Sequence, residues 1–229
     1  MCWNRSSNAS SALVCIPWAG AGAAPFRQWA PVVGHHARLY SARLAGREAR
    51  IRESPATDLD TVVAELVEAI RELPDDPVHL FGHCSGAIIA FEVARALRHE
   101  PAPALGRLIV AGQVAPRRFV ESGRSADDAQ RYLPEELRGN DEFARLMLPI
   151  LEADLRAFAR YTYVPGEPLD VPVTAIRGGR DPYVSDDDLA AWSEETTGSF
   201  TGDRVDRADA MFSGEAWGWL ADEVLRAVR

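Results

Sequence analysis

A short turn framed by two glycines constrains the fold of this chain more than any other feature of its sequence. The turn, residues 82–86 with the sequence G-H-C-S-G, follows the apolar run Val78–Phe81 and precedes a helical pattern that begins at Ala87. Glycine is required where a tight turn brings a strand and the next helix together, because a Cβ atom has no room there. The segment therefore predicts a strand, a sharp turn and a helix, with Cys84 at the apex of the turn.

The thiol of Cys84 is a candidate nucleophile. A turn of this kind holds the apical side chain in a strained backbone at the N-terminus of a helix, where the backbone N–H of Ser85 can point at a developing oxyanion. A simple tight turn with a buried cysteine is the alternative, but the strand–turn–helix context favours a nucleophile. Ser85 also carries a hydroxyl group, yet the two glycines place Cys84 at the apex. His83, on the flank of the turn, is expected to pack and to make a hydrogen bond.

The rest of the chain alternates between short apolar runs and amphipathic helical patterns, which is typical of βαβ units and a mostly parallel sheet. The predicted strands are Ala12–Pro17, Leu39–Ala42, Val78–Phe81, Leu108–Ala111 and Val173–Arg177. The predicted helices include Leu59–Glu72, Ala87–Arg98 and Ser213–Val228. Residues 117–160 show no strand pattern and predict a helical insertion between two core strands. We expect a flexible tail over residues 1–11 and one domain over residues 12–229.

The composition excludes several classes of partner. The formal net charge is −9, whereas nucleic acids and anionic membrane surfaces are bound by clustered Lys and Arg, so we expect neither. The three cysteines, Cys2, Cys15 and Cys84, show no spacing pattern and predict reduced thiols in a cytoplasmic protein. The polar N-terminus lacks the apolar region of a signal peptide, and no stretch approaches the roughly 18 apolar residues that a membrane span needs.

Six segments resemble, in the same order, the type II thioesterases of nonribosomal peptide and polyketide assembly lines. They are Cys15–Gly22 (C-I-P-W-A-G-A-G), Leu44–Glu48 (L-A-G-R-E), Phe81–Leu97, Ala111–Pro116 (A-G-Q-V-A-P), Leu148–Asp154 (L-P-I-L-E-A-D) and Gly178–Val184 (G-G-R-D-P-Y-V). The chain departs from the family pattern at Ala45, which replaces proline, and at Cys84 and Ser85, which replace serine and methionine. The resemblance implies an α/β-hydrolase fold, a mostly parallel central sheet flanked by helices, with a helical lid at about residues 117–160.

The resemblance also implies roles for individual residues. Cys84 takes the place of the nucleophile, Asp181 that of the triad acid, and the backbone N–H groups of Ala19 and Ser85 form the oxyanion hole. An Asp-Pro turn after a strand is common for reasons of turn chemistry alone. The position of Asp181 within the ordered set of matching segments nevertheless favours the role of triad acid. The family implies no bound cofactor and no metal. The acyl substrate would arrive on the 4′-phosphopantetheine arm of an acyl- or peptidyl-carrier protein.

The histidine of the expected triad is missing. In α/β hydrolases the triad runs nucleophile, acid, histidine along the chain, so the histidine should follow Asp181. All five histidines, His35, His36, His79, His83 and His99, precede residue 100. The family segment G-G-H-F is expected near residues 207–212, where the histidine position holds Ala210 or, with a shift of one residue, Asp209. Asp181 then has no imidazole to orient, which puts its acid role in doubt.

Cysteine without histidine predicts acyl transfer rather than hydrolysis. A serine hydroxyl needs a base to attack at neutral pH, whereas a cysteine thiol is partly ionised already, and more so at a helix N-terminus. Cys84 is therefore expected to take an acyl or aminoacyl group from one carrier-protein thioester and to pass it to a second acceptor, in antibiotic or other secondary-metabolite biosynthesis. Water must lose a proton as it attacks, and losing the triad histidine costs a serine protease up to about 10⁶ in kcat.

Three other functions stay open. The nearest is an editing thioesterase that hydrolyses stalled acyl groups, with Asp209 or a residue of the lid as the base. A second is a cyclase, in which a nucleophile within the substrate attacks the Cys84 thioester. A third is a non-catalytic carrier-protein binder, which a Cys84→Ala variant with full pathway function would favour.

Overall fold

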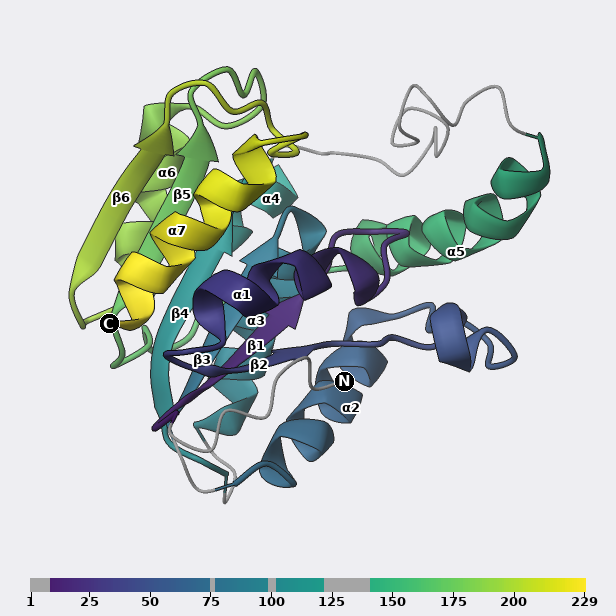
Figure 1. Cartoon of the computed structure of the whole chain (residues 1–229), viewed down its shortest axis with the longest axis horizontal. Coiled ribbons are helices and arrows are strands. Elements are labelled where there is room, and N and C mark those ends of the chain that lie inside the picture. The colour runs from purple at the N-terminus through teal and green to yellow at the C-terminus, as the bar shows by residue number, and fades with distance from the viewer. Residues whose placement is uncertain (1–8, 75–76, 99–101, 122–140) are drawn as a thin grey trace.

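Six strands form a sheet in which all neighbouring strands are parallel (Figure 1). The computed structural model describes residues 9–74, 77–98, 102–121 and 141–229. In the spatial order β2-β1-β3-β4-β5-β6, the strands are Arg38–Ser41, Ala12–Ile16, Val78–His83, Leu105–Ala111, Val173–Gly178 and Phe200–Val205. Helices cover both faces of the sheet, which confirms the predicted fold class.

Alternate residues of the central strands face opposite helical layers. In β1, Val14 and Ile16 pack in the cluster on the side of α2 (Leu59–Arg71) and α3 (Ser85–Leu97). Leu13 and Cys15 pack in the cluster on the side of α1 (Ala30–Val33) and α7 (Ala216–Val228). Because both faces are covered, β1 is buried at every position and forms a continuous apolar run in the sequence. Smaller elements are η1 (Ala24–Trp29), η2 (Glu48–Arg50), α6 (Asp186–Ala190) and η5 (Ala191–Glu195).

The start and the buried face of helix α2 both follow from its local sequence. Its N-cap residue is Asp58, whose Oδ1 accepts a hydrogen bond from the Thr61 amide at 2.8 Å; such a cap typically contributes about 1 kcal/mol. The residues that α2 buries are Leu59, Val62, Leu66, Val67 and Ile70. They lie on one face of the helix, as the amphipathic pattern of the predicted helix Leu59–Glu72 requires, and they pack against α3.

The sixth strand, β6, was not predicted from the sequence. Its sequence, F-T-G-D-R-V, is largely polar, and most of its residues are exposed or half-buried. It lies at the edge of the sheet and pairs with β5 alone. A strand in this position has no need of the continuous apolar run by which buried parallel strands are found.

The chain between β4 and β5 is helical where the structure describes it. It carries α4 (Pro116–Glu121) and α5 (Asp141–Ala159), in agreement with the helical insertion predicted at about residues 117–160. Residues 122–140 and the side chains of Phe143 and Leu146, which belong to that predicted lid, lie outside the described part. The second half of α5 packs on the body of the protein, while its first half extends away from the sheet (Figure 1).

The predicted flexible tail lies mostly outside the described residues, since the description begins at residue 9. Ala9 and Ser11 are buried, and the Ser11 carbonyl oxygen accepts a hydrogen bond from the Arg38 amide at 2.9 Å. The chain is therefore already packed beside β2 at Ser11. None of the helices in the described ranges is both long enough and apolar enough to cross a bilayer.

Candidate active site

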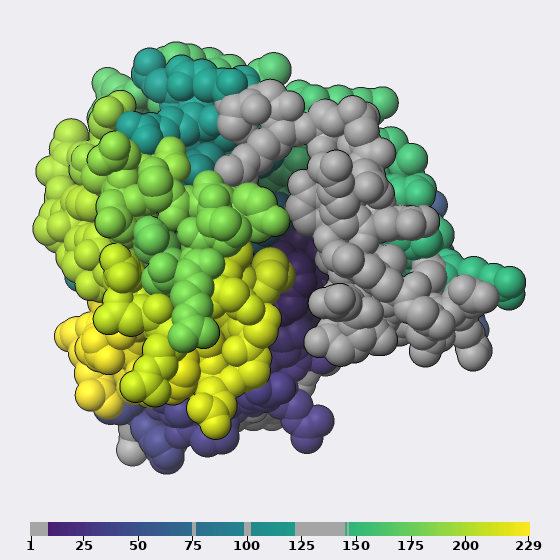
Figure 2. All heavy atoms as spheres, turned by 90° about the horizontal axis from the view of Figure 1, so that it is seen from above, coloured from purple at the N-terminus to yellow at the C-terminus, as the bar shows by residue number. Residues whose placement is uncertain are grey.

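The residues predicted to be functional gather at the carboxyl ends of the central strands. The chain leaves β1 toward the β2 edge of the sheet and leaves β3 toward the β4 edge, so the strand order reverses between β1 and β3. Ligands of open parallel sheets bind at such a switch point. Seen from above, N-terminal residues (purple) lie in a hollow beside the C-terminal part of the chain (green to yellow) (Figure 2).

Cys84 occupies the sharp turn between β3 and α3. Its backbone has φ 51° and ψ −123°, a conformation that residues other than glycine rarely adopt and that stores on the order of 1–3 kcal/mol of strain. A Cβ on Gly82 would overlap the carbonyl oxygen of Gly86, and a Cβ on Gly86 would overlap that of Ile16. The Cys84 amide donates to the Ala111 carbonyl oxygen at 2.8 Å, which ties the turn to β4. The half-buried thiol is thus held at the N-terminus of α3 and is not part of a disulfide.

The loop after β1, residues 17–22, faces this turn, and two of its amides are hydrogen-bonded to side chains. The Ala19 amide donates to Ser85 Oγ at 2.7 Å, and the Gly20 amide donates to Asp154 Oδ2 at 2.7 Å. The structure therefore brings together Ala19 and Ser85, the two residues predicted to form the oxyanion hole. The Ala19 N–H, however, points at a hydroxyl group of the protein itself.

A buried ion pair joins the segment after β2 to α5, and both of its side chains also contact the β1 loop. Arg47 donates to both carboxylate oxygens of Asp154, from Nη1 at 2.9 Å and from Nη2 at 2.8 Å. The same Nη1 donates to the Ala21 carbonyl oxygen at 3.0 Å. The two side chains are only 4% and 12% exposed. Because a bidentate pair fixes distance and angle together, Arg47 and Asp154 hold the segment after β2 against α5, with the β1 loop hydrogen-bonded to both side chains.

This ion pair was not predicted from the sequence. Arg47 and Asp154 stand within two of the segments that resemble the thioesterase family, yet nothing in either segment indicates the other as its partner. They are 107 residues apart, so the pairing depends on how α5 folds back. The sequence offered one hint of the pair: each of two segments that resemble the thioesterase family, Leu44–Glu48 and Leu148–Asp154, carries one of the two charged residues.

Replacing Asp154 with asparagine is expected to lower the free energy of unfolding by about 3–5 kcal/mol, because it leaves the buried Arg47 guanidinium without its counter-charge. Urea unfolding of the two proteins measures the difference. Glu68→Gln is the matched control, since Glu68 pairs with Arg71 at 3.0 Å on the exposed surface of α2, where loss of a pair costs less than about 1 kcal/mol. Similar losses in both variants would contradict a structural role for the Arg47–Asp154 pair.

Asp181 follows β5 and is buried. Its Oδ1 accepts hydrogen bonds from the amides of Tyr183 at 2.7 Å and Val184 at 3.2 Å, which fixes the carboxylate on its own turn. The neighbouring Arg180 amide donates to the Ala208 carbonyl oxygen at 2.9 Å. The predicted acid and the predicted histidine position therefore lie on two loops that are hydrogen-bonded to each other.

The loop after β6 carries Ala210 to the side of the nucleophile turn. His83 Nε2 lies 3.3 Å from the Ala210 carbonyl oxygen, so this nitrogen carries a proton and donates it. A Cβ on Gly112, at the end of β4, would lie 2.9 Å from the same oxygen. The backbone of Ala210, one of the two residues predicted at the histidine position, is thus in contact with the residue that precedes Cys84, but an alanine side chain offers no base.

The imidazole of His83 is kept neutral by its surroundings. Its ring contacts three aromatic rings edge-on, those of Trp18, Phe212 and Trp217. Burial lowers the pKa of His83 to about 4, although the hydrogen bond with the Ala210 backbone and the charge of Asp209 act in the opposite direction. A group with this pKa is a weak base at neutral pH. His83 packs and makes a hydrogen bond, as the sequence predicted.

The carboxylate of Asp209 is committed to its own turn. Its Oδ1 accepts hydrogen bonds from the amides of Met211 and Ser213, both at 3.0 Å. Partial burial raises the pKa of Asp209, but hydrogen bonds from Ser213, Met211 and Phe212 outweigh burial, and the pKa lies below its usual value. Stabilising the charged form makes a carboxylate a weaker base. This geometry does not favour Asp209 as a substitute for histidine.

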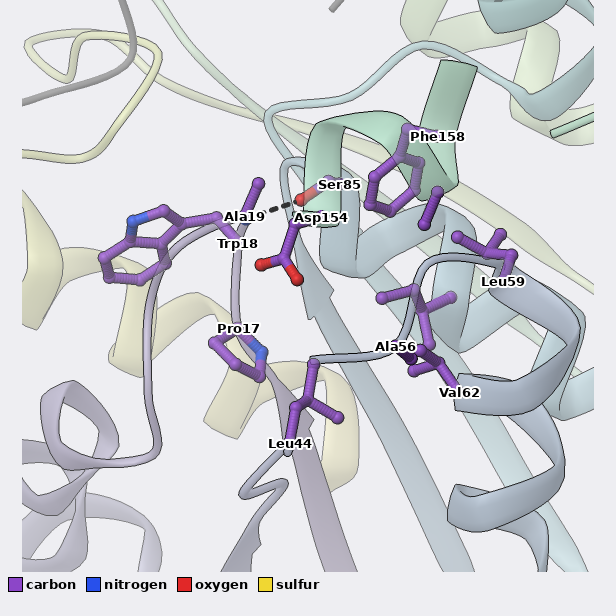
Figure 3. A pocket seen from close by; sticks show the side chains of 12 residues that line it. Pro17, Trp18, Ala19, Leu44, Ala56, Leu59, Val62, Ser85, Asp154 and Phe158 are labelled. Carbon is purple, nitrogen blue, oxygen red and sulfur yellow. Dashed lines mark hydrogen bonds between the residues drawn. The ribbon is translucent and has the colours of Figure 1, made fainter. Parts of the chain in front are cut away.

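A narrow apolar pocket opens beside the Ala19–Ser85 hydrogen bond (Figure 3). Its apolar walls include Leu44, Ala56, Leu59, Val62, Ile89, Ala157 and Phe158. Its free volume is about 10 Å³, which is room for about one water molecule. Helix α5 supplies Asp154, Ala157 and Phe158 to the lining, and the pocket in this form has no room for an acyl chain.

Cys84 is the more accessible of the two thiols that the structure describes. Cys15 is buried in β1, and burial raises its pKa well above the usual value, which makes it inert. Cys2 lies outside the described residues. Within the described ranges, no group of three His, Cys, Asp or Glu side chains is placed to hold a metal ion.

Comparison with known proteins agrees with this geometry. The thioesterase-domain family profile matches residues 11–228. The gramicidin S biosynthesis protein GrsT of Aneurinibacillus migulanus is 33% identical over 217 residues, which cover 87% of this chain and 83% of that protein. RedJ, a thioesterase of the prodiginine pathway of Streptomyces coelicolor, superposes with a TM-score of 0.81 at 32% identity, covering 97% and 87% of the two chains. BorB, the type II thioesterase of the borrelidin cluster, superposes with a TM-score of 0.85 at 28% identity, covering 100% and 97%. The chain belongs to the thioesterase family, alongside the type II thioesterases of nonribosomal peptide and polyketide pathways.

Proposed function

We propose that this protein takes an acyl or aminoacyl group from the phosphopantetheine thioester of a carrier protein onto Cys84 and passes it to a second thiol. In the loading step the Cys84 thiolate attacks the thioester carbonyl carbon, a new C–S bond forms, and the bond to the phosphopantetheine sulfur breaks. The departing thiolate takes up the proton that Cys84 released. Unloading is the same exchange with a different thiol, so the acyl group stays activated throughout.

The position of the Cys84 thiol supports the loading step. It lies at the N-terminus of α3, where the unpaired backbone N–H groups of a helix favour negative charge. The backbone of Cys84 is hydrogen-bonded to β4 and lies between two closely packed glycines, Gly82 and Gly86. The turn that carries the sulfur is therefore fixed before substrate arrives. A thiolate held in this way needs no general base to attack a thioester.

The observation that carries the proposal is the combination of Cys84 with Ala210. Exchange of one thioester for another needs no base once the thiol is ionised, whereas water must lose a proton as it attacks. Alanine stands at the histidine position, the nearby His83 imidazole has a pKa of about 4, and the Asp209 carboxylate is bound within its own turn. Acyl transfer therefore fits these side chains better than hydrolysis.

The relatives support a carrier protein as the acyl donor. GrsT is named for gramicidin S biosynthesis, RedJ for the prodiginine pathway and BorB for the borrelidin cluster. Assembly lines of this kind hold their intermediates as phosphopantetheine thioesters. We take the donor to be an acyl- or peptidyl-carrier protein in secondary-metabolite biosynthesis, and we propose no bound cofactor for the protein itself.

Intact-mass spectrometry of the protein after mixing with an acyl-loaded carrier tests the proposal. The expected result is an increase equal to one acyl group, located on Cys84 by peptide mapping, which persists in buffer and disappears when a second thiol is added. Cys84→Ala is the control and should show no increase. Rapid appearance of free acid without a lasting adduct would replace transfer by hydrolysis, and release as a ring would replace it by cyclisation.

A further inference from the structure

Three consecutive backbone amides of the β1 loop, those of Ala19, Gly20 and Ala21, are engaged by the protein itself. Ala19 donates to Ser85 Oγ at 2.7 Å and Gly20 donates to Asp154 Oδ2 at 2.7 Å. Ala21 donates to the Trp18 carbonyl oxygen at 3.0 Å. The Ala19 N–H, which was predicted to donate to the substrate, therefore donates to the Ser85 hydroxyl group in this structure.

The Ser85 hydroxyl still has a hydrogen to donate. A hydroxyl group combines one donor with two acceptor lone pairs, and the Ala19 amide uses one of the lone pairs. Among the residues that the structure describes, no acceptor for the Ser85 hydrogen is found, although the residue is only 8% exposed. Ser85 lines the narrow pocket, and Figure 3 shows its oxygen facing Ala19 at the edge of that pocket.

The distance between the two groups matches that of an oxyanion and its donor. Oxyanion donors lie about 2.7–3.1 Å from the charged oxygen, and Ser85 Oγ lies 2.7 Å from the Ala19 nitrogen. The hydroxyl oxygen thus takes the place that a substrate oxygen would otherwise take at this amide. A hydroxyl that accepts from an amide is also polarised, which strengthens its own donation.

We propose that the Ser85 hydroxyl is the oxyanion donor of this protein, with the Ala19 N–H donating to Oγ and the Oγ–H donating to the thioester oxygen. This inference rests on the proposed acylation of Cys84. When the Cys84 thiolate attacks, the carbonyl π electrons move onto the substrate oxygen, which the Ser85 hydrogen then stabilises. The electrons return as the phosphopantetheine thiolate leaves. Ser85 keeps its proton throughout and is neither nucleophile nor base.

A Ser85→Ala variant tests this role, because removing the hydroxyl also frees the Ala19 amide. The measurement is the rate at which the acyl mass leaves an acyl-loaded carrier protein, compared with the rate at which iodoacetamide alkylates Cys84. Alkylation passes through no oxyanion and so reports the thiol alone. We expect Ser85→Ala to slow acyl removal by about 10²–10³-fold and to leave the alkylation rate unchanged. Ser85→Thr, which keeps a hydroxyl, should retain most of the wild-type rate.

The outcomes separate this role from its rivals. Acyl removal that is unchanged or faster in Ser85→Ala would mean that the hydroxyl only blocks the Ala19 amide, and would overturn the proposal. A parallel fall in acyl removal and alkylation would assign Ser85 a structural role instead, as would a Ser85→Thr variant as slow as Ser85→Ala. Loss of acyl mass from the carrier is counted whether the acyl group stays on Cys84 or passes to water. Failure of the proposed transfer function can therefore be distinguished from failure of the proposed role of Ser85.

Discussion

An Ala210→His variant is expected to release the acyl group from Cys84 to water about 10²–10⁴ times faster than the wild-type protein. Ala210 is one of the two residues predicted at the histidine position, and its loop is hydrogen-bonded to the segment that carries Asp181, through the Arg180 amide and the Ala208 carbonyl oxygen. An imidazole added there supplies the base that water needs. The measurement is the lifetime of the acyl group on Cys84, followed by intact mass, together with the free acid that appears.

A substitution at Asp181 provides the control for the faster acyl release expected of Ala210→His. The Asp181 carboxylate is already fixed by the amides of Tyr183 and Val184, so it is placed to orient an imidazole on the adjoining loop. Adding Asp181→Asn to Ala210→His should remove most of the gain, because a triad histidine with a wrong partner loses up to about 10⁴ in rate. In the wild-type background the same substitution should have little effect on release, since there is no imidazole to orient. A folded Ala210→His variant with unchanged release would contradict the assignment of the histidine position.

The parts of the site that could be predicted from the sequence are those that depend on local chemistry. The turn around Cys84 was recognisable because its two glycines, the preceding apolar run and the following helix are contiguous in the chain. The missing histidine was recognisable because chain order alone dictates where it should stand. Strands β1, β3, β4 and β5 were recognisable because buried parallel strands form largely apolar runs.

The parts that could not be predicted depend on contacts between distant segments. The polar edge strand β6 is defined by its pairing with β5, not by its own pattern. The Arg47–Asp154 pair exists only because α5 folds back over the β1 loop. The structure places the Ala19 amide beside Ser85, but a sequence cannot show that a side-chain hydroxyl would accept the hydrogen bond of that amide. Motifs identified the groups, and tertiary packing determined which groups are in contact.

Replacing Cys84 with serine is expected to slow loading from an acyl-carrier protein by more than about 10³-fold. A serine hydroxyl is a weak nucleophile until a base removes its proton, and a serine protease that loses its triad histidine falls by about 10⁶ in kcat. The wild-type protein also lacks a histidine at residue 210, but a thiol can ionise without a base, so loading is still expected. The acyl mass that leaves the carrier and the adduct on the protein measure loading, with Cys84→Ala as the baseline.

The proposal makes the effect of Cys84→Ser depend on residue 210. Alone, the substitution should remove loading almost entirely, but combined with Ala210→His it should restore a hydroxyl nucleophile with its base and hence loading followed by hydrolysis. The two changes are therefore expected to be strongly non-additive, as groups that act as one unit are. If Cys84→Ser alone loads at the wild-type rate, the site must contain a general base that activates the hydroxyl group. Cysteine in place of serine would then not be what compensates for the missing histidine.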